Sequence, residues 1–144
     1  MAGNTMVQEK TWSFTVEPPP PGVTVTPTVL NLSPTDVLTC VRSELLTVTN
    51  NGPGDVTFAA VSITGQDAEY FSSGSQRFLA NNGPFTVLDR NFFQDAVTFT
   101  AGSTPAERNS EKIYTATLTY QDGTGATIGN QVSLTAKAQC LNFG

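Results

Sequence analysis

The fold is decided by residues 112–120, KIYTATLTY, the most regular stretch of the chain. Polar and apolar residues alternate in it, which is the period of a β-strand with one buried face. The alternation returns in residues 131–138, and Asp122-Gly123 between the two stretches is typical of a hairpin turn. The pair predicts a two-stranded sheet whose buried face carries Tyr114, Ala116, Leu118 and Tyr120 from the first strand and Val132, Leu134, Ala136 and Ala138 from the second.

Further short strands precede this hairpin, and turn signals such as Asn50-Asn51-Gly52-Pro53-Gly54 separate them. No stretch has sustained helical periodicity. About seven strands at this spacing predict an all-β fold, an immunoglobulin-like antiparallel β-sandwich. The expected earlier strands are residues 23–32, 44–50, 56–64, 85–88 and 96–100.

The first 22 residues differ from the rest of the chain. We predict that residues 1–22 form an extended N-terminal arm and that residues 23–144 form the sandwich. Within the arm, residues 11–16, TWSFTV, alternate like a strand, and the four prolines at 18–21 favour a stiff polyproline II spacer.

Exposed aromatic side chains commonly mark a contact with another molecule. We therefore predict that Trp12, Phe14 and Val16 bind a partner. The alternative is that the arm folds back and adds an edge strand to its own sandwich, and the sequence leaves both readings open.

Composition excludes several classes of partner. The net charge is −5, and the seven Lys and Arg residues are scattered, so we expect no binding to nucleic acid or to an anionic membrane. Residues 1–10 are polar and lack the apolar run of a secretory signal. We expect a chain that is not exported by that route, or one whose signal has been removed.

The sequence offers no conventional catalytic group. Histidine is absent, which removes Ser–His and Cys–His nucleophile pairs, and two cysteines are too few for a structural zinc site. The carboxylate pairs Asp67 with Glu69 and Asp89 with Asp95 are read as solvated loop acids. We predict no enzyme activity, no catalytic residue, no metal site and no cofactor.

Residues 46–52, LTVTNNG, are followed by the strand of residues 56–65 and by residues 67–71, DAEYF. This order resembles the choice-of-anchor and abnormal-spindle/Hydin class of immunoglobulin-like domains, over about residues 24–138. The usual Pro-Gly before the later Val-x-Phe strand is replaced by Asp89-Arg90-Asn91. The resemblance implies a targeting, adhesive or structural module without catalysis. Similar domains also decorate the particles of tailed bacteriophages.

The two cysteines flank the predicted sandwich. Cys40 precedes the second strand and Cys140 follows the last one. In such a sandwich the first and last strands run parallel and the second runs back, which brings both cysteines to the same pole. Two alternatives stay open: a disulfide between Cys40 and Cys140, or two reduced cysteines that lie near one another.

We predict a structural assembly protein, a virion capsid decoration (cement) protein of a tailed phage. It would sit on the capsid surface as a homo-oligomer and bind the major capsid protein, other shell subunits and copies of itself. The alternative is an immunoglobulin-like interaction or adhesion module of the bacterial cell surface or periplasm.

Overall fold

The structure is a computed structural model that describes residues 22–35, 38–102, 104, 107–108, 112–138 and 140. Within these residues, no helix has the length and apolar character needed to cross a membrane. The elements, in chain order, are β1 (Val23–Thr26), β2 (Val29–Asn31), β3 (Val41–Asn50), β4 (Val56–Phe58), β5 (Ala60–Thr64), a 3-10 turn η2 (Ala68–Tyr70), β6 (Phe71–Ser73), α1 (Gly74–Asn82), β7 (Phe85–Val87), β8 (Phe92–Thr100), β9 (Ile113–Gln121) and β10 (Thr127–Lys137).

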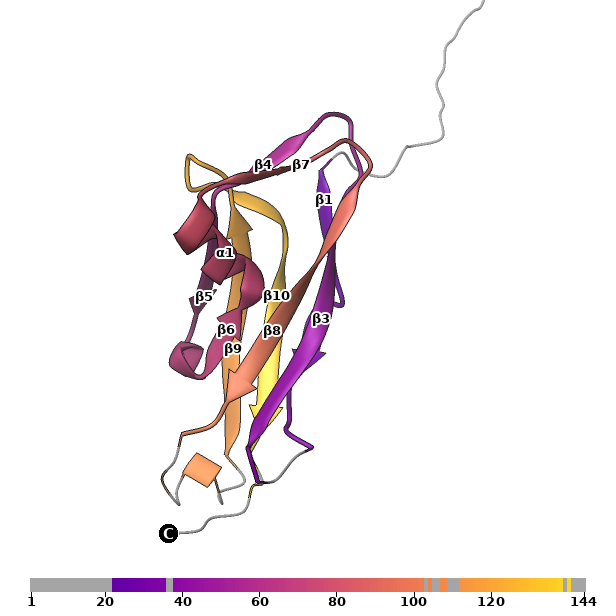
Figure 1. Cartoon of the computed structure of the whole chain (residues 1–144). Helices are drawn as coiled ribbons and strands as arrows, with labels where there is room; N and C mark the ends of the chain where they lie inside the picture. Colours follow the sequence, from indigo (N-terminus) through magenta and orange to yellow (C-terminus); the bar gives the residue numbers. More distant parts are fainter. Residues whose placement is uncertain are drawn as a thin grey trace, which may run out of the picture.

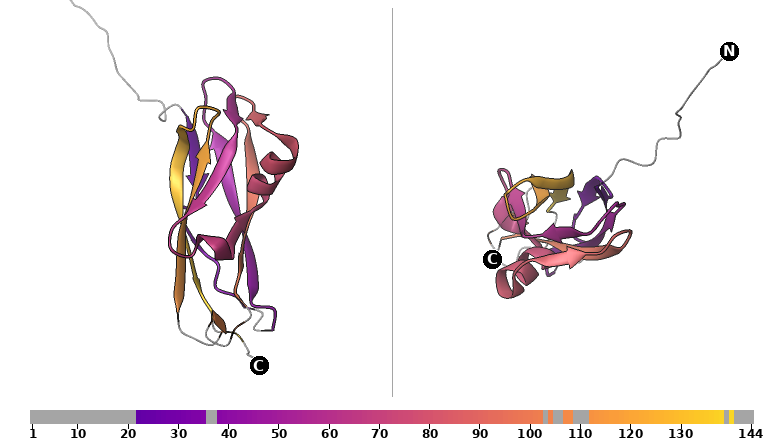
Figure 2. Two further views of the ribbon diagram at one scale, coloured as in Figure 1. Left: turned by 90° about the vertical axis from the view of Figure 1, so that its left-hand side faces the viewer. Right: turned by 90° about the horizontal axis from the view of Figure 1, so that it is seen from above.

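Two four-stranded sheets pack face to face, which confirms the predicted all-β sandwich. One sheet has the strand order β1-β3-β8-β6 and the other β2-β10-β9-β5. Seen from above, they form two layers, and α1 lies outside them at one side (Figures 1 and 2). A small β4-β7 sheet crosses one end of the sandwich (Figure 1).

The stretch KIYTATLTY forms β9 and pairs with β10 as predicted. Leu134 lies opposite Ala116, and Ala136 lies opposite Tyr114. β2 runs parallel to β10, as expected for the first and last strands of this sandwich. The inward side chains of both sheets form one core, whose largest fully buried members are Tyr114, Tyr120, Phe58, Phe99, Leu32, Leu46, Leu118 and Leu134.

One side of the sandwich is closed where β1 meets β10. The Asn130 side chain accepts a hydrogen bond from Val25 N–H at 2.8 Å and donates one to Val25 C=O at 2.9 Å. Gly129 has a φ of +72°, and a Cβ there would lie 2.7 Å from the Val23 carbonyl oxygen, so this close approach requires glycine. The outer edge of β1 is therefore occupied by the protein's own side chain.

The structure differs from the prediction in two respects. Ten strand segments replace the expected seven among the described residues. The first strand divides between the two sheets, the strand of residues 56–64 breaks at Ala59, and β6 was not predicted. The prediction of no helix is wrong, because α1 is present. Ser73 caps α1 by accepting a hydrogen bond from Gln76 N–H at 3.2 Å, and Gly83 ends it. Its nine residues bury one large apolar side chain, Leu79, which is too little for a periodic signal.

Candidate functional site

Strand β8 has an edge that β6 covers only in part. β6 pairs with β8 opposite Val97, Thr98 and Phe99 and then ends at Ser73, where α1 begins. On its other side, β8 pairs with β3 along its whole length, Phe92 to Thr100. From Phe92 to Ala96, β8 therefore has a strand partner on one side only within the described residues.

The hydrogen-bond pattern shows where the main-chain groups of this edge point. Asn50 N–H donates to Asn91 C=O, and Ala101 N–H donates to Cys40 C=O, at the two ends of the β3–β8 pair. Main-chain groups alternate along a strand, so the odd-numbered residues of β8 face β3. The N–H and C=O groups of Phe92, Gln94 and Ala96 consequently point away from β3, toward α1.

A groove of about 480 Å³ opens between this edge and α1. Figure 1 shows α1 above the end of β6 and beside β8. Gly74 lies near the Ala96 end, where a Cβ would be 3.6 Å from the Ala96 carbonyl oxygen. The side chain of Phe78 forms part of the wall and is 48% exposed. The remaining lining residues are Ser75, Phe85, Phe93, Gln94 and Asp95.

The apolar floor of the groove belongs to a cluster of aromatic rings. Phe85 contacts Phe78, Phe93 and Phe58, with ring centroids 5.7, 5.2 and 5.4 Å apart. Phe58 and Phe93 in turn pack edge-on against Tyr120. Because the rings support one another down to the core, the groove has a rigid floor.

Beneath the groove, the buried carboxylate of Asp95 links three elements. It accepts hydrogen bonds from the Ser73 hydroxyl at 2.7 Å, the Tyr120 hydroxyl at 2.6 Å and the Ser75 N–H at 3.0 Å. Ser73 and Ser75 bracket the start of α1, and Tyr120 lies on β9 in the opposite sheet. Asp95 therefore fixes both the helix that walls the groove and the distance between the sheets.

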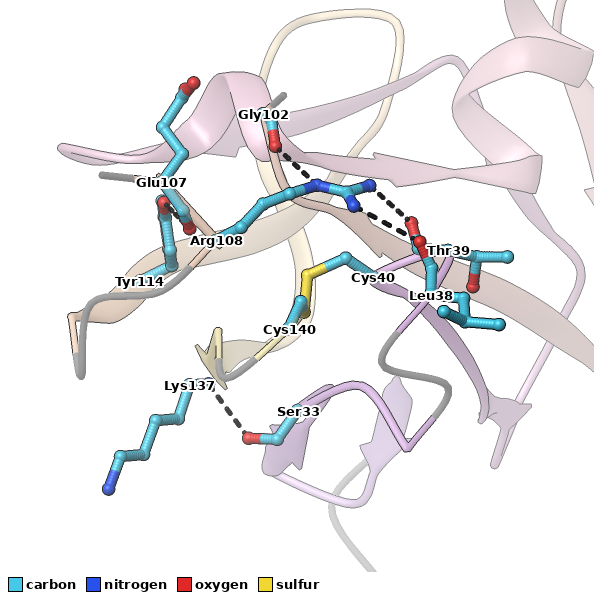
Figure 3. Close-up of a disulfide and its surroundings, with 10 residues drawn as sticks. All are labelled: Ser33, Leu38, Thr39, Cys40, Gly102, Glu107, Arg108, Tyr114, Lys137 and Cys140. Carbon is cyan, nitrogen blue, oxygen red and sulfur yellow. Dashed lines mark hydrogen bonds between the residues drawn. A yellow bond between two sulfur atoms is a disulfide. The ribbon is translucent and has the colours of Figure 1, made fainter. Parts of the chain in front are cut away.

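At the opposite end of the sandwich, the structure joins Cys40 and Cys140 in a disulfide, with their Cα atoms 5.6 Å apart (Figure 3). Both residues are buried. The Arg108 guanidinium donates hydrogen bonds to the carbonyl oxygens of Gly102, Leu38 and Thr39 (Figure 3). Arg108 C=O also accepts a hydrogen bond from Cys140 N–H at 2.7 Å. These bonds tie the segment around Arg108 to the bridge.

The surroundings of the tyrosines hold their phenols in the neutral form. A hydrogen bond of 2.7 Å to the Glu107 carboxylate is the main cause that raises the pKa of Tyr70 to about 12. Burial raises the pKa of Tyr114, and burial followed by the charge of Asp95 raises the pKa of Tyr120 far above its usual value. Hydrogen bonds from Thr104 and then Tyr70 lower the pKa of the Glu107 carboxyl.

We predict that none of the three tyrosines ionises near pH 10 while the protein is folded. Because each folded-state pKa is above the unfolded value, the stabilisation is complete below pH 10 and is lost as the pH rises toward 12. A near-ultraviolet absorbance titration of the folded protein should show all three tyrosines ionising at a higher pH than in concentrated urea, where they should ionise together near pH 10. A tyrosinate step near pH 10 in the folded protein would contradict the assignment.

The structure describes only some of the site residues that were predicted from the sequence. Trp12, Phe14 and Val16 lie outside the described residues, as does the rest of residues 1–21. That Cys40 and Cys140 are bridged in the purified protein stays a prediction. The structure includes no group of three or more His, Cys, Asp or Glu residues suited to a metal ion among those it describes.

The reading of the acids as solvated is wrong for Asp67 and Asp95. Asp67 is 3% exposed and binds the Thr115 N–H at 3.0 Å and the Lys112 ammonium at 3.3 Å. Asp95 is 1% exposed. The predicted strand began at Ala96, four residues after the start of β8 at Phe92, but the alternation of Phe99 and Val97 extends back to Asp95 and would have placed it inward.

Comparisons with known proteins identify the fold but do not identify a family. No family model and no curated protein sequence matches the chain. Among solved structures, the ASH/PapD-like domain of human CEP192 is similar over 91% of this chain and 97% of that one, at 15% identity and a TM-score of 0.51. The chain is thus similar to immunoglobulin-like PapD-like domains, which confirms the immunoglobulin-like part of the resemblance. The choice-of-anchor and phage-decoration parts find no support among these neighbours.

Two bacterial chaperone structures are similar to the same extent. The E. coli chaperone DraB aligns over 81% of this chain and 55% of its own, at 12% identity and a TM-score of 0.53. A complex of the Salmonella enterica pilin SafA with the chaperone SafB aligns over 82% of this chain and 55% of that chain, at 13% identity and a TM-score of 0.53. The chain therefore spans about half of these two chains.

Proposed function

We propose that this chain is a non-enzymatic protein-interaction module, which receives an extended segment of a partner protein in the groove between α1 and β8. The observation that carries the proposal is the edge of β8, which presents main-chain groups of Phe92 and Gln94 beside an aromatic groove. Main-chain hydrogen bonds supply affinity in strand addition, and alternate side chains of the added strand fill pockets. The groove volume of about 480 Å³ suits such side chains.

The comparisons support the alternative prediction better than the virion one. A chain from a complex of a pilin with its chaperone shares this fold, which is consistent with a module that binds other proteins. A buried disulfide belongs to oxidising compartments, which supports placement at the bacterial surface or in the periplasm. The decoration of a virion, with a capsid protein as partner, remains a prediction without support from the comparisons.

The test is a panel of ten-residue peptides, with alternating polar and apolar residues or with the same residues in scrambled order. It is measured against the chain with Phe14→Asp, whose own N-terminal arm lacks one apolar side chain and competes less with the peptides. Alternating peptides should bind more tightly than scrambled ones. Gln94→Pro removes the outward N–H without removing a bond to β3, and it should weaken binding at least about tenfold. Gln94→Thr keeps that N–H and should weaken binding far less.

A matched pair of side-chain variants tests the groove itself. Phe78→Ala removes part of the groove wall and should weaken the binding of alternating peptides. The variant should still fold, because Phe78 is half exposed on a helix. Ile113→Ala also removes an exposed apolar side chain, 59% exposed, but at the far end of β9, and it should leave binding unchanged. Equal affinity of all these proteins for alternating and scrambled peptides would exclude strand addition.

A further inference from the structure

We infer that the segment that occupies the groove is residues 11–16, TWSFTV, of a second copy of this chain. The inference rests on the proposed function and names the partner. It follows from four observations: the length of the segment, its chemistry, the closure of the competing edge and the position of Gly22.

The segment and the open edge match in length. Six residues in a strand cover about 20 Å, and the five residues from Phe92 to Ala96 cover about 17 Å. Trp12, Phe14 and Val16 would all lie on one face of the added strand. The segment can therefore pair along the whole open edge of β8 with its apolar face on one side.

The chemistry of the two surfaces is complementary. The groove is lined by the rings of Phe78, Phe85 and Phe93, and its one acidic residue, Asp95, is buried and hydrogen-bonded. Residues 11–16 carry no charge. Three apolar side chains would enter the groove, while the Thr and Ser side chains of the segment would face solvent beside the outward residues of β8, which are Phe92, Gln94 and Ala96 along this edge.

The other edge near the start of β1 is closed. Asn130 holds both main-chain groups of Val25, so an arm that folded back there would have to displace two hydrogen bonds. In the other sheet, the outer edge of β5 is also partly covered. The Gln76 side-chain amide donates a hydrogen bond to the Val61 carbonyl oxygen at 3.2 Å there. The open stretch of β8 has no such covering side chain among the described residues.

The position of Gly22 favours a second copy over the chain's own groove. Gly22 is held by hydrogen bonds with Gly52 C=O and Asn51 N–H, next to β1. The far edge of β8 is three strand spacings away, about 14 Å. The connection from Val16 to Gly22 runs through Glu17 and four prolines, and its six residue steps span about 19 Å as a polyproline II rod. Only about 5 Å remains beyond the crossing, and a stiff proline rod does not make the two sharp bends that docking on the same chain requires.

Each copy has one donor segment and one acceptor groove. Reciprocal exchange between two copies would close a two-fold dimer in which both grooves are filled. Two linked contacts hold such a dimer together more strongly than one.

The test uses the full-length protein, whose single tryptophan, Trp12, reports on the segment. Sedimentation should show a dimer that dissociates on dilution, with blue-shifted Trp12 emission in the dimer. An acceptor-deficient variant, Gln94→Pro or Phe78→Asp, and a donor-deficient variant, Phe14→Asp, should each be monomeric. Mixing the two should restore association through one donor–acceptor contact, at least about tenfold weaker than in the unmodified protein.

Three results would overturn the inference. The first is a monomer whose Trp12 is exposed to water at all concentrations. The second is a monomer with buried Trp12, which would mean that the segment docks on its own chain, and the third is a dimer that survives all three substitutions. None of them bears on the proposed function, because the peptide panel, measured on the Phe14→Asp variant whose own segment cannot fill the groove, tests the groove independently. Peptide binding without self-association would leave the module intact and reject only this partner.

Discussion

Asp95→Ala is expected to lower the free energy of unfolding by about 3–5 kcal/mol. The substitution leaves the hydroxyls of Ser73 and Tyr120 and the N–H of Ser75 without their acceptor. Each buried donor left unsatisfied costs about 1–3 kcal/mol. A typical domain is stable by only about 5–15 kcal/mol, so this one carboxylate accounts for a large fraction of the total.

Urea unfolding followed by circular dichroism measures this difference. Asp95→Asn retains an acceptor oxygen and should cost less, about 1–2 kcal/mol. Glu69→Ala is the matched control, because Glu69 is an exposed acid on η2 and should change stability by under about 0.5 kcal/mol. Stability of Asp95→Ala within about 1 kcal/mol of the unmodified protein would show that the network does not hold α1 and β9 together.

Removal of the disulfide is expected to have a comparable effect. Cys40 and Cys140 are 100 residues apart in the sequence, so the bridge closes most of the chain into one loop. In the chain-entropy account, a loop of this size stabilises by about 4–5 kcal/mol. The double variant Cys40→Ala/Cys140→Ala should lose about that much in urea unfolding.

The bridge itself is checked by thiol alkylation and mass spectrometry without reductant. The folded protein and the urea-unfolded protein should both have no reactive thiol. Because both cysteines are buried, a mild reductant should act only when the chain unfolds. Two alkylated cysteines in the unreduced protein would mean that the bridge is absent and that the double variant should lose little stability.

The fold could be predicted from sequence where one strand has a clear inner and outer face. Tyr114, Leu118 and Leu134 alternate with polar residues, and this period gives the β9–β10 pair and the buried face of each strand. The start of β10 at Thr127 and the register shift between Ile128 and Val132 were not predicted. α1 could not be found in this way, because it buries so few residues. Its signals were the capping Ser73 and the final Gly83, which are common in loops as well.

The candidate site could not be predicted from sequence patterns either, for a different reason. It exists because β6 stops at Ser73 and uncovers β8, and the end of one strand relative to another is a tertiary property. Phe78, Phe85 and Phe93 are far enough apart in the sequence that nothing local joins them. Asp95 was misassigned because an acid in a strand contradicts the usual apolar pattern, although its neighbours Phe93 and Val97 share its inward face.

Main-chain amide exchange at Gln94, followed by NMR in the Phe14→Asp variant, whose groove is expected to be empty, tests the central claim that a partner segment adds to the edge of β8. The measurement compares this variant alone with the variant saturated by the tightest-binding peptide of the panel. The Gln94 amide should be protected about tenfold or more by the peptide, whereas the Asp95 amide, which faces β3, should be unchanged. A bound peptide that leaves the exchange of Gln94 unaltered would contradict the account.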